Sequence, residues 1–271
     1  MSDTIRTFGP QAGRPLLALH CSLAHGGAWE PLARALPEQR IVAPDLLGHG
    51  AMPLWSGDGD FALQALDRVT ALAEDLAARH GGPIDLMGHS FGGVMALALA
   101  QRRPDLIRSL CLIEPVIFAA AKITAPAVFA EGMQAFAGVE ADVAQGDAMA
   151  AAAAFLGQWG AGLPFSVLPK RQQDYAAQRM NIVVAPQRVL ADDGLGLLAA
   201  GALEAMALPV LLVEGGKSPA LVAAITAHLL VRLPDVTHLV VDKAAHMLPL
   251  THPQKLAPAL GAHLCQGCLA D

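Results

Sequence analysis

A serine flanked by glycines stands between two apolar segments, and this arrangement restricts the fold more than any other feature of the chain. Residues 88–92 read Gly-His-Ser-Phe-Gly, with the apolar run 84–87 before them and the alanine-rich run 94–100 after them. A strand, a sharp turn and a helix are therefore predicted, with Ser90 at the turn. Such a turn forces the serine into a strained backbone conformation that glycine neighbours accommodate. The pattern is typical of a nucleophile elbow.

Short apolar runs alternate with longer amphipathic segments along most of the chain. The runs are bounded by turn residues, as expected of strands buried on both faces of a parallel sheet. They occupy residues 16–20, 41–44, 84–87, 110–113, 210–213 and 238–241. Residues 61–80 and 219–230 have apolar positions at helical spacing. The sequence thus predicts an α/β fold with a mostly parallel central sheet flanked by helices, and residues 4–8 can add an antiparallel edge strand.

The alternation stops between residues 116 and 206. This stretch is rich in alanine and methionine, has helical periodicity and contains no clear strand. Two interpretations are open, a row of ordinary surface helices or a helical cap folded over the serine, and we favour the cap. The predicted division is a core of residues 1–115 and 207–271 with a cap of residues 116–206. Its lining should be apolar and adaptable, with phenylalanines at positions 129, 136, 155 and 165.

The composition indicates a small-molecule partner. The chain has 271 residues, 54% of them hydrophobic, and a formal net charge of -6. No cluster of Lys and Arg offers a phosphate backbone or an anionic membrane a binding surface, so we expect neither nucleic acid nor membrane as a partner. The first residues do not have the pattern of a signal peptide, and cytoplasmic localisation is expected. A homodimer is an open alternative to a monomer.

The cysteines do not indicate a disulfide framework or a metal site. Four cysteines in a chain of this length are too few for a disulfide scaffold. Cys265 and Cys268 form a single C-x-x-C near the end of the sequence, with no second pair of ligands nearby. We therefore expect no metal and no cofactor.

Several further motifs accompany the elbow in a fixed order. His20-Cys21-Ser22 follows the first buried strand, residues 45–50 read Asp-Leu-Leu-Gly-His-Gly, and residues 245–247 read Ala-His-Met. With these motifs the chain resembles the α/β-hydrolase superfamily over most of its length, and the likeness is faint only in residues 116–206. The resemblance implies the α/β-hydrolase fold with a helical cap inserted after the sixth strand. It also implies a catalytic triad and an oxyanion hole, whereas the type of reaction has to be argued from the site.

Chain order selects the histidine that would activate the serine. A serine hydroxyl is a weak nucleophile unless a base takes its proton, and histidine titrates near neutrality. In the superfamily this histidine comes last, after the final strand. His246 follows residues 238–241 in a small-small-His motif, so we predict it as the base. His252 is the second choice, and it is better explained as part of the start of the last helix.

The acid of the predicted triad departs from the usual pattern. The family's aspartate would fall at Ser218, which cannot carry a negative charge. Glu114 directly follows the strand 110–113, where haloalkane dehalogenases of this superfamily carry their acid, and we predict it as the third member. A carboxylate between apolar residues also needs a partner. Glu214, Asp242 and a dyad without an acid are the alternatives.

Two backbone amides are predicted to form the oxyanion hole. The resemblance places them at Phe91, directly after the nucleophile, and at Ser22, although Cys21 stands where the family usually has glycine. The later His25-Gly26-Gly27 superficially resembles a lipase loop, but it lies too far beyond the strand and is predicted to be a flexible turn. Asp45 is predicted to shape the neighbouring loop.

These residues together predict a serine-dependent hydrolase. Its substrate would be a small carboxylic ester or lactone with an apolar acyl part, processed through an acyl-enzyme on Ser90. The resemblance leaves three other reactions open: C-C bond hydrolysis of ring-cleavage products, acyl transfer and haloperoxidase-like chemistry. A dehalogenase or an epoxide hydrolase is disfavoured because those relatives have aspartate in place of Ser90. A binding module without turnover is the alternative from another class.

Overall fold

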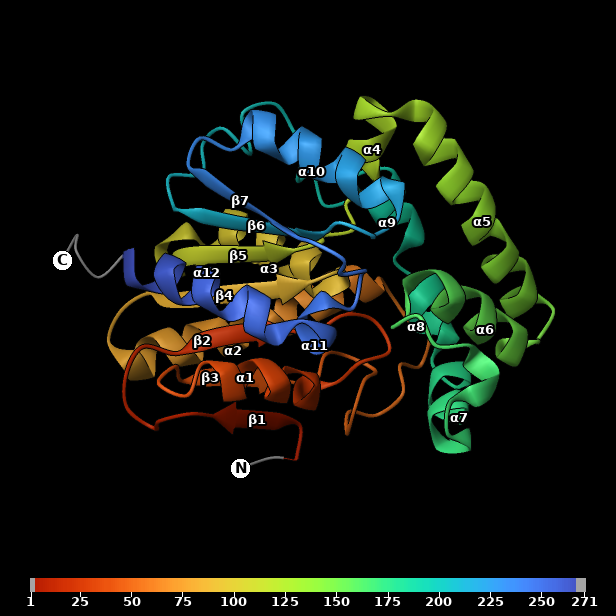
Figure 1. Cartoon of the computed structure of the whole chain (residues 1–271), viewed down its shortest axis with the longest axis horizontal. Coiled ribbons are helices and arrows are strands. Elements are labelled where there is room, and N and C mark those ends of the chain that lie inside the picture. Colours follow the sequence, from red (N-terminus) through yellow and green to blue (C-terminus); the bar gives the residue numbers. More distant parts are fainter. Residues whose placement is uncertain (1–2, 267–271) are drawn as a thin grey trace.

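A single sheet forms the centre of the molecule (Figure 1). The computed structural model describes residues 3–266. Seven strands lie within these residues: β1 (Ile5–Phe8), β2 (Leu16–Leu19), β3 (Ile41–Pro44), β4 (Ile84–His89), β5 (Ile107–Ile113), β6 (Val210–Gly215) and β7 (Val236–Val241). Their order in the sheet is β1-β3-β2-β4-β5-β6-β7. Only β1 runs antiparallel, beside β3, so the predicted mostly parallel sheet and its antiparallel edge strand are confirmed.

Successive residues of the inner strands enter two separate hydrophobic cores. Leu17 and Leu19 of β2 belong to the core on one face, while Leu16 and Ala18 belong to the core on the other face. The same alternation holds along β4, β5 and β6. Side chains of a strand point alternately to the two faces of a sheet, and both faces of this sheet are covered by helices. The continuous apolar runs in the sequence follow from this double burial.

Helices cover both faces of the sheet. The helices outside the segment between β5 and β6 are α1 (Glu30–Ala35), α2 (Phe61–His80), α3 (Phe91–Arg102), α10 (Ala220–Arg232), α11 (Leu248–Thr251) and α12 (Pro253–Gln266), with short 3-10 turns η1 (Gly26–Trp29) and η2 (Pro104–Leu106). Apolar residues of α2, α3 and α10 fill one core, and those of α1, α11 and α12 fill the other. The predicted helix 61–80 therefore matches α2. Where a flexible turn was predicted at His25 to Gly27, the chain forms the 3-10 turn η1, and the His25 side chain caps its start by accepting from Gly27 N.

A row of helices separates β5 from β6 and extends beyond one end of the sheet (Figure 1). These helices are α4 (Phe118–Thr124), α5 (Pro126–Ala144), α6 (Ala148–Trp159), α7 (Lys170–Ala177), α8 (Met180–Val184) and α9 (Gln187–Ala191), with the 3-10 turn η3 (Phe165–Val167). From the sequence these helices are expected after a sixth strand. They follow β5, which is the fifth strand of the described residues. The first of them, α4, packs against α10 and buries Phe118 in the core of the sheet. The helices from α5 to α8 project outward, and we call them the outer helices.

The elbow glycines lie where α3 approaches the sheet most closely. A Cβ atom on Gly92 would overlap the backbone carbonyl oxygens of Leu19 and His20. Because the backbone atoms at the end of β2 cannot move aside cheaply, we expect Gly92→Val to lower the free energy of unfolding by about 3 kcal/mol or more. Gly138→Ala in α5, where a Cβ would meet open space, is the matched control and should be neutral or slightly stabilising. Urea denaturation compares the two, and a Gly92→Val protein of normal stability would contradict this geometry.

Candidate active site

Ser90 lies between the carboxyl end of β4 and the start of α3. Its backbone has φ 55° and ψ -120°, a strained conformation for a residue with a side chain. The amide of Ser90 donates to Ile113 O of β5, and the carbonyl of Ser90 accepts from Gly93 N and Val94 N at the start of α3. These bonds hold the turn in place from both sides. The predicted strand, turn and helix are therefore present, with the serine at the apex of the turn.

His246 and Glu114 meet beside this turn. His246 Nδ1 lies 2.6 Å from Glu114 Oε2, and the two side chains are 3% and 0% exposed. A carboxylate oxygen accepts the hydrogen bond, so Nδ1 carries the proton and Nε2 is left free to accept one. A buried bond of this kind fixes both the tautomer and the orientation of the imidazole.

Glu114 is held by three donors. Its Oε1 accepts from Gly215 N at 2.6 Å and from Ser218 Oγ at 2.5 Å, and Oε2 accepts from His246. Glu114 also has a positive φ of 45°, which turns its side chain off the end of β5 toward β6. Ser218, at the position where the family's aspartate would fall, thus supports the glutamate that stands in for it. A fully buried carboxylate needs such a set of donors.

The alternative residues considered from the sequence lie elsewhere. Glu214 faces His238 across β6 and β7 at 3.2 Å, and the Asp242 side chain is exposed. His252 bonds to Thr251 Oγ1 at 2.9 Å near the surface. None of these three makes a hydrogen bond to His246 within residues 3–266. Glu114 is thus the carboxylate that the structure brings to this histidine.

The two amides predicted for the oxyanion hole, those of Ser22 and Phe91, lie at the end of the sheet that carries Ser90. Neither N-H donates a hydrogen bond to another residue of the described chain. Phe91 N begins α3, where the first amides of a helix have no partner within the helix and the helix dipole favours negative charge. Ser22 follows β2, the strand that neighbours β4. Both amides thus belong to the same edge of the sheet as Ser90.

The two reacting atoms of the predicted pair are not hydrogen-bonded to each other. Ser90 Oγ and His246 Nε2 also make no hydrogen bond to any other described residue, and neither is among the described polar atoms that are sealed from solvent without a partner. The nearby thiol of Cys21 does not compete with Ser90 as a nucleophile, because burial raises the pKa of this thiol to about 12. Cys21 is therefore protonated at neutral pH and is a poor nucleophile.

Two aromatic side chains beside His246 were not assigned a role from the sequence. His89 precedes Ser90, and its Nε2 lies 2.8 Å from the backbone oxygen of His246, with the two rings 4.8 Å apart. Trp159, the last residue of α6, places its indole 4.8 Å from the imidazole at an interplanar angle of 75°. The position of His89 at the end of β4 could have indicated its proximity, whereas nothing in the sequence places Trp159 there.

The outer helices are fastened to the loops around the site. Tyr175 of α7 donates its hydroxyl to Ala24 O at 3.0 Å and accepts from Gly50 N at 2.8 Å. Arg179 donates from Nε to Gly48 O, and its guanidinium lies 3.8 Å from the centre of the Tyr175 ring. The loop that receives them is itself organised by Asp45, whose carboxylate accepts from the amides of residues 26 and 51 and from the Arg6 guanidinium. The structure thus agrees with a shaping role for Asp45.

Two buried histidines below these loops make stability depend on pH. Burial lowers the pKa of His20 to about 4 and that of His49 to about 3, so both are neutral in the folded protein at pH 6. The unfolded chain takes up protons at these positions below about pH 6.5. Stability is therefore fully present above pH 6.5 and falls as the pH drops, by about 1.4 kcal/mol per pH unit for each histidine. We expect His49→Gln to reduce this slope between pH 6 and 4, measured by urea unfolding at each pH. An unchanged slope would show that His49 is protonated in the folded protein.

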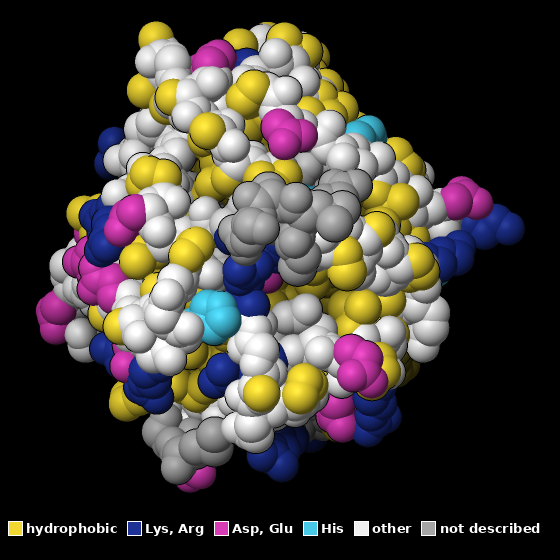
Figure 2. All heavy atoms as spheres, turned by 90° about the vertical axis from the view of Figure 1, so that its left-hand side faces the viewer, with side chains coloured by type: hydrophobic (Ala, Val, Ile, Leu, Met, Phe, Trp, Pro, Cys, Tyr) yellow, Lys and Arg dark blue, Asp and Glu magenta, His cyan; other side chains and the backbone are white. Residues whose placement is uncertain are grey.

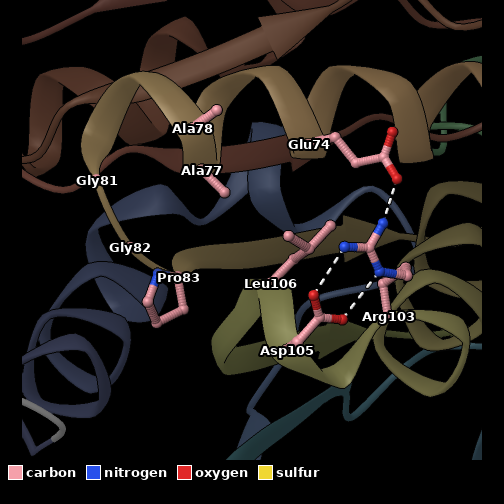
Figure 3. A pocket seen from close by; sticks show the side chains of 9 residues that line it. All are labelled: Glu74, Ala77, Ala78, Gly81, Gly82, Pro83, Arg103, Asp105 and Leu106. Carbon is pink, nitrogen blue, oxygen red and sulfur yellow. Dashed lines mark hydrogen bonds and ion pairs between the residues drawn. The ribbon is translucent and has the colours of Figure 1, made fainter.

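Hollows and charges elsewhere do not offer another reacting centre. A surface hollow of about 510 Å³, lined among others by Glu74, Pro83 and Arg103, lies where the chain enters β4 (Figure 3). Its cation, Arg103, is held between Glu74 and Asp105. On the face shown in Figure 2, acidic and basic side chains are interspersed.

Residues 3–266 contain no group of three metal-ligating side chains, and none of their helices has the length and apolarity to cross a bilayer. The second cysteine of the C-x-x-C, Cys268, lies outside the described residues.

Comparison with known proteins gives the family. Residues 16–259 match the model of the alpha/beta hydrolase family. The chain belongs to this family. It is 31% identical over 252 residues to the pimeloyl-[acyl-carrier protein] methyl ester esterase of Neisseria meningitidis serogroup B, covering 92% of each chain. It is 40% identical over 116 residues to Lipase LipV of Mycobacterium tuberculosis, which is 42% of this chain and 41% of the relative.

A solved structure shows the same fold. Est816, described as an N-acyl homoserine lactone degrading enzyme, superposes with a TM-score of 0.70 over 95% of each chain at 18% identity. At that identity the likeness concerns the fold. The family and its esterase and lipase relatives identify the protein as a hydrolase with the alpha/beta hydrolase fold.

Proposed function

We propose that the protein hydrolyses a small carboxylic ester or lactone through an acyl-enzyme on Ser90. The observation that carries this proposal is the buried 2.6 Å bond between Glu114 and His246, beside a serine held in the strained turn after β4. A carboxylate in this position serves to stabilise an imidazolium, and the imidazolium forms when the histidine removes the serine proton. Phe91 N and Ser22 N are the donors for the oxyanion.

The steps follow from these positions. Ser90 Oγ bonds to the carbonyl carbon while its proton passes to His246 Nε2, and the carbonyl oxygen becomes the oxyanion. The carbon-alkoxy bond then breaks, and His246 returns the proton to the leaving alkoxide. Water repeats the sequence on the acyl-enzyme, with its proton going first to His246 and then to Ser90 Oγ. The acid is released and the enzyme is restored.

The outer helices support an apolar acyl group as the part that the enzyme recognises. Phe136 is buried with small and apolar residues of α5, α6, α7 and α8, and Phe155 packs against this group. We infer that the outer helices form the cap over the substrate site. Tyr175 and Arg179 connect them by hydrogen bonds to the loops around Ser90. The names of the esterase and lipase relatives support an ester as the substrate.

Labelling with a fluorophosphonate tests the proposal. These probes react with a serine that an adjacent base activates, so we expect a single adduct on Ser90, mapped by peptide mass spectrometry. Ser90→Ala should abolish the adduct, whereas Ser22→Ala, which keeps the backbone amide, should retain it. An adduct on another serine would overturn the assignment of the nucleophile. A folded protein that forms no adduct would favour a binding module without turnover.

A substrate panel separates the reactions that share this site. Methyl and ethyl esters of short acids, simple lactones and a vinylogous ring-cleavage product are assayed with the same enzyme preparation. We expect the esters to be hydrolysed fastest. Preference for the ring-cleavage product would instead assign C-C bond hydrolysis to the same Ser90.

A further inference from the structure

Trp159 connects the outer helices with His246. It ends α6, is 6% exposed and lies with its indole 4.8 Å from the imidazole centre. The centre of its ring also lies 6.1 Å from that of Phe118, which is 5% exposed in α4. Among the ring contacts and hydrogen bonds of residues 3–266, Trp159 is the one side chain of the outer helices that contacts the Glu114 and His246 pair. The indole therefore belongs to the same hydrophobic core as Phe118 and also contacts the histidine ring.

The neighbours of His246 leave little of its ring open. Glu114 occupies Nδ1, His89 lies against the ring at an interplanar angle of 44°, and Trp159 approaches it nearly perpendicularly at 75°. Nε2 makes no hydrogen bond to another residue within 3–266 and is not sealed from solvent. In the proposed reaction, Nε2 returns its proton to the leaving alkoxide, so the alcohol part of the ester has to lie beside this ring. A side chain that packs against this imidazole, as Trp159 does, therefore lies next to the space that the alcohol needs.

We propose that Trp159 is a specificity-determining residue that restricts the leaving group to small alcohols such as methanol. This inference rests on the proposed ester hydrolysis at Ser90. It adds that the site discriminates against esters with a bulky alcohol. A bulky alkoxy group would have to displace the indole from its packing against Phe118 and His246. Because both rings beside it are buried, the displacement costs packing contacts that a methoxy group leaves intact.

Acylation and deacylation together distinguish a role of Trp159 in selecting the alcohol from a general role in catalysis. The alcohol is present only until the acyl-enzyme forms, and deacylation is common to all esters of one acid. A residue that limits the alcohol therefore changes the relative kcat/KM of esters that share one acid. It leaves the preference among methyl esters of different acids unchanged.

The test uses Trp159→Ala and two ester series. For methyl, ethyl, butyl and benzyl butyrate, we expect the ratio of kcat/KM for benzyl over methyl ester to rise about tenfold or more in the variant. For methyl esters of acids of increasing length, the order and the ratios should stay as in the wild type. Gln158→Ala, which changes the exposed neighbour of Trp159 on the same helix, is the control and should leave the benzyl over methyl ratio unchanged.

Several outcomes would overturn the proposal. An equal fall of kcat/KM for all esters would show that Trp159 only supports His246, and a change confined to the acid series would assign it to the acyl side. Should Trp159→Ala fail to fold, Trp159→Phe and Trp159→Leu provide the same ratio with less loss of volume. If the wild type is not labelled at Ser90, the ester reaction itself is wrong. If labelling succeeds and the ratio does not move, only the role of Trp159 is wrong.

Discussion

Replacing Ser90 with alanine should lower the turnover of any ester that the enzyme hydrolyses by about a thousandfold or more. In the proposed mechanism no acyl-enzyme forms without the hydroxyl, and the remaining rate comes from water attack on a bound substrate held by the proposed oxyanion donors, the amides of Ser22 and Phe91. Single-turnover and steady-state rates with the best ester of the panel measure the loss. Ser22→Ala is the matched control and should retain most of the activity, because its proposed contribution comes from the backbone.

Stability measurements distinguish this chemical loss from unfolding. Ser90 has φ 55°, and alanine has the same strain there because it also carries a Cβ atom. We therefore expect Ser90→Ala to unfold at nearly the wild-type temperature, and Ser90→Gly to be more stable by about 1 kcal/mol, because glycine adopts positive φ freely. A Ser90→Ala enzyme with near-normal turnover would contradict the proposed mechanism, whatever its stability.

The sheet could be predicted from the sequence because burial on both faces leaves a simple signal. Each central strand is a short apolar run, and turn residues mark its ends. The bounds of β4 and β5 still extend beyond the predicted runs, to His89 at one end of β4 and to Ile107 at the start of β5. His89 is polar, so hydropathy alone ends the run too early.

The candidate site was partly accessible to the same reasoning. Ser90 and His246 follow from chain order, and Glu114 follows from the absence of an acid at Ser218 together with an acid after β5. The hydrogen bond from Ser218 to Glu114 could not be predicted. A serine at a position usually held by aspartate indicates only that the usual acid is missing, and not that the serine donates to another acid. Trp159 lies in a segment whose sequence gives helices without their placement, so its contact with His246 required the structure.

Glu114→Gln should lower turnover by about two to four powers of ten while the fold persists. The glutamate accepts hydrogen bonds at both oxygens, from Gly215 N and Ser218 Oγ at Oε1 and from His246 Nδ1 at Oε2. A glutamine has one acceptor oxygen. If that oxygen faces Gly215, its NH2 group meets Nδ1 and favours the tautomer with the proton on Nε2, which cannot accept the serine proton. If the oxygen faces His246, the buried amide of Gly215 loses its acceptor, and in both orientations the charge that stabilises the imidazolium is gone.

The position of the charge can be tested by moving it. Glu214→Gln and Asp242→Asn remove acids that do not contact His246, and we expect each to change kcat by less than about threefold. Ser218 Oγ lies 2.5 Å from Glu114 Oε1, so a carboxylate at position 218 starts close to the pair. The double variant Glu114→Gln with Ser218→Asp should therefore recover about tenfold or more of the kcat lost in Glu114→Gln. Recovery of kcat with an unchanged KM would show that the charge acts on His246 during the reaction and not on substrate binding. Normal kcat in Glu114→Gln would instead show that Glu114 only fills its buried site, and Ser90 and His246 would then work as a dyad.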